Sequence, residues 1–282
     1  MRLVSFDAGG RPRAALLRDD RVYEISESET AGRRRAEDRT LEAILAGGLL
    51  DDVHPTEDDG VPVDGVTLLP PLTRPGKIIC IGLNYRGHAE EQGQEPPETP
   101  TFFAKFANAL ARPGGTVKLP EWSRKVDYEA EVAFVVGKRA KDVPEQDALE
   151  HVAGYTLLND LSARDYQFKT PQWMPGKVFD GAAPCGPALV TPDEAGAHDA
   201  IEIELRLNGE LMQKSSTADL IHSVPALVAY LSKLMTLEPG DVISTGTPAG
   251  VGSLRDPRVW LKPGDEIVIS SPQLGVLETR VA

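Results

Sequence analysis

Strict alternation of apolar and polar side chains is the feature that most limits what this chain can fold into. The stretch IEIELRLNGE has apolar residues at every second position, as in a strand with one buried face: Ile201, Ile203, Leu205 and Leu207. Asn208-Gly209 then suits the positive φ angles of a tight hairpin. Other strand-like runs are KIICIGLN, FVVGK, AGYTLLND, GDVISTG, DEIVIS and GVLETRV. Mostly antiparallel strands with few helices predict a β-rich sandwich or roll.

The first 72 residues look like a small α+β domain that precedes a larger domain, residues 73–282. LVSFD and RVYEI are strand-like and joined by a turn with glycine and proline, and residues 40–50 have a modest helical pattern. The turn-rich stretch DDVHPTEDDGVPVDG is typical of a linker. A well-formed strand then begins at Lys77.

One helix is clearly predicted, in SVPALVAYLSKLM. Ser223 is a suitable N-cap, and Pro225 falls in the first turn, where its missing N–H is not needed. The pattern predicts a buried stripe formed by Leu227, Tyr230, Leu231 and Leu234. No repeat and no Gly-rich dinucleotide loop is present in the sequence.

Composition indicates an ordinary globular protein, with 41% hydrophobic and 26% charged residues among 282. No apolar run is long enough for a membrane span, and MRLVSFDAGG lacks the apolar centre of a signal peptide. We therefore expect a cytoplasmic protein.

A formal net charge of −13 argues against binding to nucleic acid or to anionic lipid. The basic run Arg33–Arg35 lies among polar residues and is interpreted as a solvated loop. The two cysteines, Cys80 and Cys185, form no CxxC pair, and Cys80 lies in the apolar run KIICIG as a buried thiol would. Neither disulfides nor thiol catalysis is expected.

Two carboxylates fall on the face of a strand that is about to be buried. In VDYEAEVAFVV, Glu129 and Glu131 share a face with Ala133 and Val135, and Asp160 ends the apolar run AGYTLLND. If the three acids converged, each pair at ~5 Å would repel by about 3 kcal/mol at an effective dielectric constant near 20. Either two of them stay protonated, or a divalent cation lies among them: Mg²⁺ or Mn²⁺, with Ca²⁺ a poorer fit.

A plainer interpretation of these acids stays open at this point. Glu129 and Glu131 could lie at a solvated strand end, and Asp160 could cap a helix that starts at Leu161. An ExE pair on a strand is not a specific signal.

The spacing of other polar residues makes them candidates for functional roles. His88 and Glu91 share one side of a helix, where the carboxylate would fix the imidazole tautomer, or they lie on an acidic helix surface. Arg164 and Gln167 would share one side of a helix that begins near Leu161, facing the acids or solvent. The turn around Thr247 exposes backbone N–H groups that can bind a carboxylate, or it is a tight turn with no binding role.

From about Lys77 to the C-terminus the chain resembles the fumarylacetoacetate hydrolase family. The stretches that carry the resemblance occur in the family's order: IGLNYRGHAEE, PTFFAKFANAL, VDYEAEVAFVVGKRAKDV, AGYTLLNDLSARDYQ, PGKVFDGAAPCGP and PGDVISTGTPAGVG. The resemblance implies a mixed β-sandwich roll, a divalent metal and a homodimer. It also implies that Glu129, Glu131 and Asp160 bind Mg²⁺ or Mn²⁺.

The same resemblance assigns roles around the metal. It implies that the His88–Glu91 pair lies on a lid and activates water, and that Lys177 points at the substrate. It implies that Arg164 and Gln167 meet the substrate's oxygens, whereas Asp165 is structural. The resemblance also points, less directly, to four more residues around the pocket. These are Phe103 near it, Tyr85 at its entrance, Thr247 in the turn and Trp173 just before Lys177. The role of Lys105 is left open.

These residues lead us to expect a metal-dependent hydrolase acting on ketonic substances. It would cleave a C–C bond of a 2,4-dioxo acid, such as an acylpyruvate or fumarylpyruvate, through a metal-bound enolate. Oxaloacetate decarboxylation and isomerisation or decarboxylation of 2-hydroxy-dienoates are alternatives on the same site. The His88–Glu91 pair favours hydrolysis, because decarboxylation needs no activated water. A non-catalytic metabolite-binding homologue would be expected to lack the acids.

Overall fold

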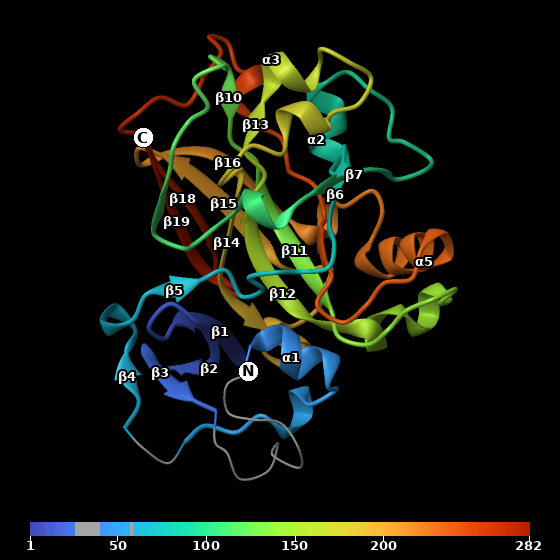
Figure 1. Cartoon of the computed structure of the whole chain (residues 1–282). Coiled ribbons are helices and arrows are strands. Elements are labelled where there is room, and N and C mark those ends of the chain that lie inside the picture. Colours follow the sequence, from blue (N-terminus) through green and yellow to red (C-terminus); the bar gives the residue numbers. More distant parts are fainter. Residues whose placement is uncertain (26–39, 57–58) are drawn as a thin grey trace.

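The computed structural model describes residues 1–25, 40–56 and 59–282 (Figure 1). Its largest sheet has 12 strands, and one half of it belongs to the larger predicted domain. Neighbours along the main path of this part are antiparallel except β17 and β6, which are parallel, and the short β8 (Leu110–Ala111) also pairs parallel with β14. Their order is β14 (Ala183–Val190), β12 (Val152–Asn159), β11 (Ala130–Val136), β17 (Val242–Ser244), β6 (Ile78–Gly82) and β7 (Thr101–Lys105).

A second sheet of five strands packs against the first, with β19 against β14 and β15 against β11. Its order is β16 (Glu210–Ser216), β15 (Glu202–Leu207), β18 (Glu266–Ser271), β19 (Gly275–Val281) and β9 (Gly115–Val117). The alternating residues 201, 203, 205 and 207 are all buried between the sheets. Asn208 and Gly209 form the hairpin turn with φ angles of 52° and 85°. The β-rich sandwich roll is therefore confirmed.

The N-terminal strands extend the large sheet rather than forming a sheet of their own, as the blue arrows in Figure 1 show. β1 pairs antiparallel with β14, with Arg2 opposite Val190. These elements are β1 (Arg2–Asp7), β2 (Pro12–Arg18), β3 (Arg21–Glu24), α1 (Leu41–Ala46), β4 (Val61–Pro62) and β5 (Leu68–Leu69). The two parts of the chain therefore share one hydrogen-bonded sheet.

Two predictions for this N-terminal part are wrong. LVSFD and RVYEI are not joined by one turn, because β2 lies between them and pairs with both. Asp19 and Asp20, at φ 48° and 58°, make the second tight turn, although neither is the glycine that such a turn favours. The predicted linker contains β4, which pairs with β3. The basic run Arg33–Arg35 lies outside the described residues.

The predicted helix is α5 (Val224–Leu234), with the Ser223 hydroxyl accepting from the Ala226 N–H at 3.3 Å. Its buried stripe differs in part from the prediction, since Tyr230 is half-buried and Leu234 is exposed. Val224 and Val228 join Leu227 and Leu231 instead, at helical spacing. The remaining α-helices are α2 (Arg86–Glu91), α3 (Arg164–Gln167) and α4 (Pro192–Ala195). In the described part of the chain, no helix has the length and apolar character needed to cross a membrane.

The strand predicted over 126–136 is interrupted where its carboxylates begin. It divides into β10 (Val126–Asp127), which pairs with β13 (Ser162–Ala163), and β11. Side-chain amides replace strand partners at the break: Asn159 Oδ1 accepts from the Glu129 N–H at 3.1 Å, and Gln213 Oε1 from the Ala130 N–H at 2.9 Å. Because β13 follows Asp160, the helix begins at Arg164 rather than Leu161, and Asp160 caps no helix.

The tight pairing of β12 with β14 depends on Gly154, where a Cβ would lie 2.3 Å from the Val190 carbonyl oxygen. We expect Gly154→Ala to lower the free energy of unfolding by about 2–3 kcal/mol, because the two backbones must separate. Urea denaturation measures this. Gly65→Ala is the control, since its Cβ would meet only Val61 at 3.4 Å. Equal midpoints for the two variants would contradict the expectation.

Candidate active site and metal centre

Three carboxylates from neighbouring strands meet at the interruption of β11. Glu131 lies on β11, Glu129 lies in the break, and Asp160 follows β12. The pairing of Ala130 with Asn159 brings the flanking residues together, and the Asp160 N–H donates to the Glu129 carbonyl at 2.9 Å. One oxygen from each carboxylate lies within 4.8 Å of the others, and all three residues are buried. The convergence expected from the sequence is therefore present.

Two lysine ammonium groups lie among these carboxylates. Lys177 Nζ donates to Glu129 Oε2 and to Asp160 Oδ2, both at 2.7 Å. Burial by itself lowers the pKa of Lys177, but Asp160 and Glu129 raise it, and the net shift is upward. Lys105 Nζ lies 2.7 Å from Asp160 Oδ1 and donates to the Ala182 carbonyl at 2.8 Å. Lys105, whose role the sequence left open, is therefore part of the site.

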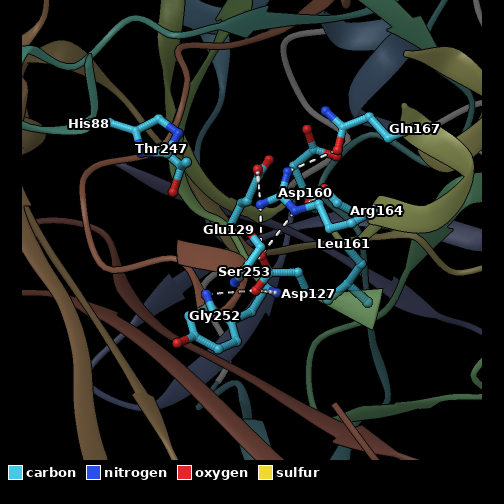
Figure 2. A network of polar contacts seen from close by, with 12 residues as sticks. His88, Asp127, Glu129, Asp160, Leu161, Arg164, Gln167, Thr247, Gly252 and Ser253 are labelled. Carbon is cyan, nitrogen blue, oxygen red and sulfur yellow. Dashed lines mark hydrogen bonds and ion pairs between the residues drawn. The ribbon is translucent and has the colours of Figure 1, made fainter. Parts of the chain in front are cut away.

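Asp127, which was not predicted from the sequence, anchors the third cation, Arg164. Asp127 Oδ2 accepts from Arg164 Nε at 2.9 Å and Nη2 at 2.8 Å, and Nη2 lies 2.7 Å from Glu129 Oε1 (Figure 2). The backbone N–H groups of Gly252 and Ser253 also donate to the Asp127 carboxylate, at 2.8 and 3.0 Å. Its position two residues before Glu129, on the same strand face, was the available signal.

Glu131 differs from the other carboxylates because it has no cationic partner among the residues that the structure describes. Its Oε2 accepts from the Ser244 hydroxyl and from the Gly246 N–H at 3.2 Å. Burial raises the pKa of Glu131 well above its ordinary value, and the nearby Asp160 and Glu129 raise it further. The site therefore holds a carboxyl group whose charge is not compensated.

The net charge of the whole cluster is negative and is therefore compatible with a bound divalent cation. Four buried carboxylates face three buried cations: Asp127, Glu129, Glu131 and Asp160 against Lys105, Arg164 and Lys177. The converging ligands are all carboxylate oxygens, the donor type that hard divalent ions prefer. The residues present therefore fit a divalent metal.

His88 lies on α2, where its two ring nitrogens have different partners. Nδ1 lies 3.1 Å from Glu91 Oε2, and Glu91 Oε1 accepts from the Gly250 N–H at 3.0 Å. A carboxylate beside Nδ1 assigns the proton to that nitrogen and leaves the lone pair on Nε2. Gln92 Nε2, 2.8 Å away, donates to that lone pair. The sequence analysis did not single out Gln92.

These groups surround a cavity of about 130 Å³. Besides the three acids, its lining includes six of the predicted residues: His88, Phe103, Arg164, Gln167, Lys177 and Thr247. Trp173 forms another wall and lies directly over Gly82, where a Cβ would be 2.2 Å from the indole ring. The Phe103 ring meets Trp173 edge-on at 6.0 Å and lies 4.9 Å from Lys177 Nζ.

Tyr85 does not lie at the entrance of this cavity, and that prediction is wrong. It is fully buried at the N-cap position of α2, where its backbone forms a bridge with Leu220. Thr247 lines the cavity, but its hydroxyl already donates to the Ala130 carbonyl at 3.0 Å. Asp165 accepts from the Ser123 hydroxyl at 2.6 Å, outside the carboxylate cluster.

A β-roll with buried carboxylates beside a His–Glu pair defines a class of metal-binding enzyme folds. Residues 77–282 match the fumarylacetoacetate (FAA) hydrolase C-terminal family, and the chain belongs to this family. Residues 1–71 match the Rv2993c-like N-terminal family. Enzymes of several kinds share this fold, as the names of relatives and solved structures similar to the chain indicate.

Relatives similar to this chain are named as tautomerases. The mitochondrial oxaloacetate tautomerase fahd2 of Xenopus laevis is 47% identical over 218 residues, 77% of this chain and 68% of the relative. Human mitochondrial oxaloacetate tautomerase FAHD2A is 44% identical over 223 residues, 78% of this chain and 71% of the relative.

Solved structures that resemble the whole chain include hydrolases. Fumarylacetoacetate hydrolase from Exiguobacterium antarcticum has a TM-score of 0.85 and 33% identity, and covers 100% of this chain and 99% of its own. Maleylpyruvate hydrolase from Sphingobium sp. SYK-6, in complex with manganese (II) ion and pyruvate, has a TM-score of 0.79 and 29% identity with the same coverage.

We expect Asp127→Asn to lower the free energy of unfolding by about 3 kcal/mol, because Arg164 stays buried while one of its two carboxylate partners, the one that holds it by two hydrogen bonds, loses its charge. Urea denaturation of the metal-free protein measures the loss. Glu121→Gln is the control, since Glu121 pairs with Lys118 at a fully solvated site and its loss should cost about 0.5 kcal/mol or less. A loss no larger than in the control would show that Asp127 does not anchor the cluster.

We expect Mn²⁺ or Mg²⁺ to stabilise the folded chain, and Glu131→Gln to abolish that stabilisation. At about 100 times the dissociation constant the gain is about 2.7 kcal/mol, which raises Tm by about 5 °C or more. Differential scanning calorimetry with and without EDTA measures the shift. Glu278→Gln, an exposed change on β19, should keep it. A metal-induced shift in the Glu131→Gln variant equal to that of the wild type would argue against this metal site.

Proposed function

We propose that this chain catalyses keto–enol tautomerisation of a small 2-oxo acid, with oxaloacetate as the first candidate. One observation carries the proposal: His88 Nε2, the Lys177 ammonium and the three converging carboxylates line the same cavity of about 130 Å³. A cavity of about 150 Å³ holds one benzene ring, so this space suits a compact keto-acid group. The names of the two tautomerase relatives support the choice of reaction.

We propose that Glu129, Glu131 and Asp160 hold Mg²⁺ or Mn²⁺. When bound, such a cation supplies Lewis acidity toward the substrate's carboxylate and keto oxygens. The other groups of the site act through their own hydrogen bonds and proton transfers.

Lys177 and Gln167 are placed to bind the substrate's oxygens. Lys177 is held in its charged form by Glu129 and Asp160, and its ammonium can donate to the keto oxygen as negative charge develops there. Arg164 Nη1 donates to Gln167 Oε1 at 2.9 Å, which fixes the amide so that its nitrogen is the group left to donate. We assign that nitrogen to a substrate carboxylate.

His88 is the group that moves the proton. Its Nε2 takes a proton from C3 of the keto acid, and the C3–H electron pair forms the C2–C3 double bond while the C2–O π pair moves to the oxygen. The Nε2–H then returns that proton to the oxygen and gives the enol. Glu91 keeps the ring in the required tautomer and stabilises the imidazolium between the two transfers.

Hydrolysis of a short 2,4-dioxo acid, an acylpyruvate or fumarylpyruvate, is the second candidate. The His88–Glu91 pair favours it, since the same Nε2 can take a proton from water. The water oxygen then adds to C4, the C3–C4 bond breaks with its electron pair on C3, and His88 returns the proton to C3 as pyruvate forms. The structure of maleylpyruvate hydrolase in complex with pyruvate supports pyruvate as a product.

Oxaloacetate decarboxylation and dienoate isomerisation use the same oxygen-binding groups, and release of pyruvate from oxaloacetate would identify the former. A homodimer and a cytoplasmic location, both expected from the sequence, stay predictions, and sedimentation equilibrium tests the first. A non-catalytic binding role is disfavoured, because a protein that only binds a metabolite has no need of a paired His88 and Glu91 beside the acids.

We expect His88→Ala to lower kcat for oxaloacetate tautomerisation by about 10²–10⁴-fold, because the proton then has no positioned acceptor. The ultraviolet absorbance of the enol follows the reaction, and pyruvate release from oxaloacetate and acylpyruvates is recorded in parallel. Glu90→Ala, an exposed change on the same helix, should leave kcat within about twofold. An unaffected His88→Ala variant would remove His88 from the proposed mechanism. Pyruvate release from acylpyruvates, without enolisation of oxaloacetate, would favour the second candidate.

A further inference from the structure

The His88–Glu91 pair is connected to a backbone group of the loop that follows β17. Glu91 Oε2 lies 3.1 Å from His88 Nδ1, and Glu91 Oε1 accepts from the Gly250 N–H at 3.0 Å. One carboxylate therefore joins the imidazole to the backbone of Gly250, and whatever fixes Gly250 also influences where the imidazole lies.

Helix α2, which carries the pair, is too short to fix its own position. It has six residues and, among the described residues, no side-chain hydrogen bond at its N-cap. An isolated helix of this length is not stable in water. Asp219 holds its first turn, because its Oδ2 accepts from the Gly87 N–H at 3.1 Å. The described residues 92–100, which follow the helix, contain no helix or strand, so the contact with Gly250 holds the other end of α2.

The backbone of Gly250 has to be fixed by its neighbours. Its φ angle is 104°, a conformation that residues with a side chain rarely adopt, and glycine is freer to rotate than any other residue. A Cβ here would lie 2.1 Å from the Met212 carbonyl oxygen, so the loop and β16 approach each other closely at this point. The direction of the Gly250 N–H therefore depends on the groups that bind the other atoms of the residue.

Arg255 binds both of the backbone carbonyls that meet there. Its Nε donates to the Gly250 carbonyl at 3.2 Å, and its Nη2 donates to the Met212 carbonyl at 2.6 Å. A planar guanidinium with donors in a fixed arrangement suits two neighbouring acceptors. The Tyr128 hydroxyl also donates to the Gly250 carbonyl, at 3.1 Å. Arg255 is half-buried, and it is not among the described residues that line the cavity.

We infer that Arg255 is a positioning residue for the proton transfer at His88. It holds the Gly250 carbonyl against β16, and the Gly250 N–H in turn holds the Glu91 carboxylate. Glu91 then keeps the imidazole in the tautomer with its proton on Nδ1. The inference rests on the proposed function for the role of His88, but the tautomer can be measured without any substrate.

Kinetics of an arginine variant tests the role. Arg255→Met keeps most of the side chain and removes its donors. We expect it to lower kcat for oxaloacetate tautomerisation by about 10- to 100-fold, because a catalytic group displaced by about 1 Å can lose about 10²-fold in rate. KM should stay within about twofold, since the variant removes no group that lines the cavity.

Arg206→Met is the matched control. Arg206 Nη1 also donates to a glycine carbonyl, that of Gly209 at 3.2 Å, but in the turn between β15 and β16. Its loss should leave kcat within about twofold of the wild type. Equal kcat values for Arg255→Met and Arg206→Met would overturn the inference.

A double variant separates positioning from a merely structural role. In a Glu91→Ala background the Gly250 N–H no longer binds a carboxylate on α2, so Arg255→Met should lower kcat no further. A residue that only stabilises the fold would lower kcat by the same factor in both backgrounds, and that result would overturn the inference. Tyr128→Phe repeats the comparison should Arg255→Met not fold. It removes the other side-chain donor to Gly250, and should lower kcat by about threefold or more when Glu91 is present and not when it is absent.

The tautomer of His88 gives a readout that needs no catalysis. Nitrogen NMR of histidine-labelled protein, at a pH where the imidazole is neutral, distinguishes a proton on Nδ1 from one on Nε2, and the His88→Ala spectrum assigns the signals. We expect the Nδ1 form in the wild type and in Arg206→Met, and a mixture of both forms in Arg255→Met. An unchanged tautomer in Arg255→Met would overturn the inference. A wild type without tautomerase activity would overturn the proposed function instead, and the NMR result would still decide the role of Arg255.

Discussion

Compensation of buried charge is the constraint on which the rest of this structure depends. Four carboxylates are buried at the interruption of β11, and three cations from other parts of the chain lie within hydrogen-bond distance of three of them, Asp127, Glu129 and Asp160. A buried ion without a partner costs several kcal/mol, so the two lysines and the arginine are conditions for folding as well as parts of the site. Because Arg164 is held by Asp127, and Asp127 by the backbone at Gly252, the cluster also fixes the loop that follows β17.

The interruption of β11 creates the candidate site within an otherwise regular sheet. An unbroken strand would satisfy its N–H groups through its neighbours and would turn alternate side chains toward the sandwich core. Here the amides of Asn159 and Gln213 accept the hydrogen bonds of Glu129 and Ala130 instead. Gln213 also donates to the Thr247 hydroxyl, so one buried amide joins β16, β11 and the turn after β17. The fold is therefore most irregular where its chemistry is concentrated.

Much of this arrangement could be predicted from the sequence, because its signals are local. Alternation and an Asn-Gly turn predict β15 and β16, a Ser-Val-Pro start predicts α5, and the spacing of His88 and Glu91 predicts their contact. The partners of Asp127 and Lys105 could not be predicted, because residues far apart in the chain meet there only after folding. Tyr85 shows the opposite error, since a position near a motif says little about which way a side chain points.

Glu131 shows how stability and function are balanced in this site. A core built for stability alone would give each buried carboxylate a cation or replace it by an apolar group. Among the described residues, the hydrogen-bond donors to Glu131 are a hydroxyl and one N–H, while the cations contact Asp160 and Glu129. Burial raises the pKa of Glu131, and the neighbouring Asp160 and Glu129 raise it further, so the charged form of this carboxylate is costly. A fourth cation from the chain would remove the cost but would also fill the place where we propose that a metal binds.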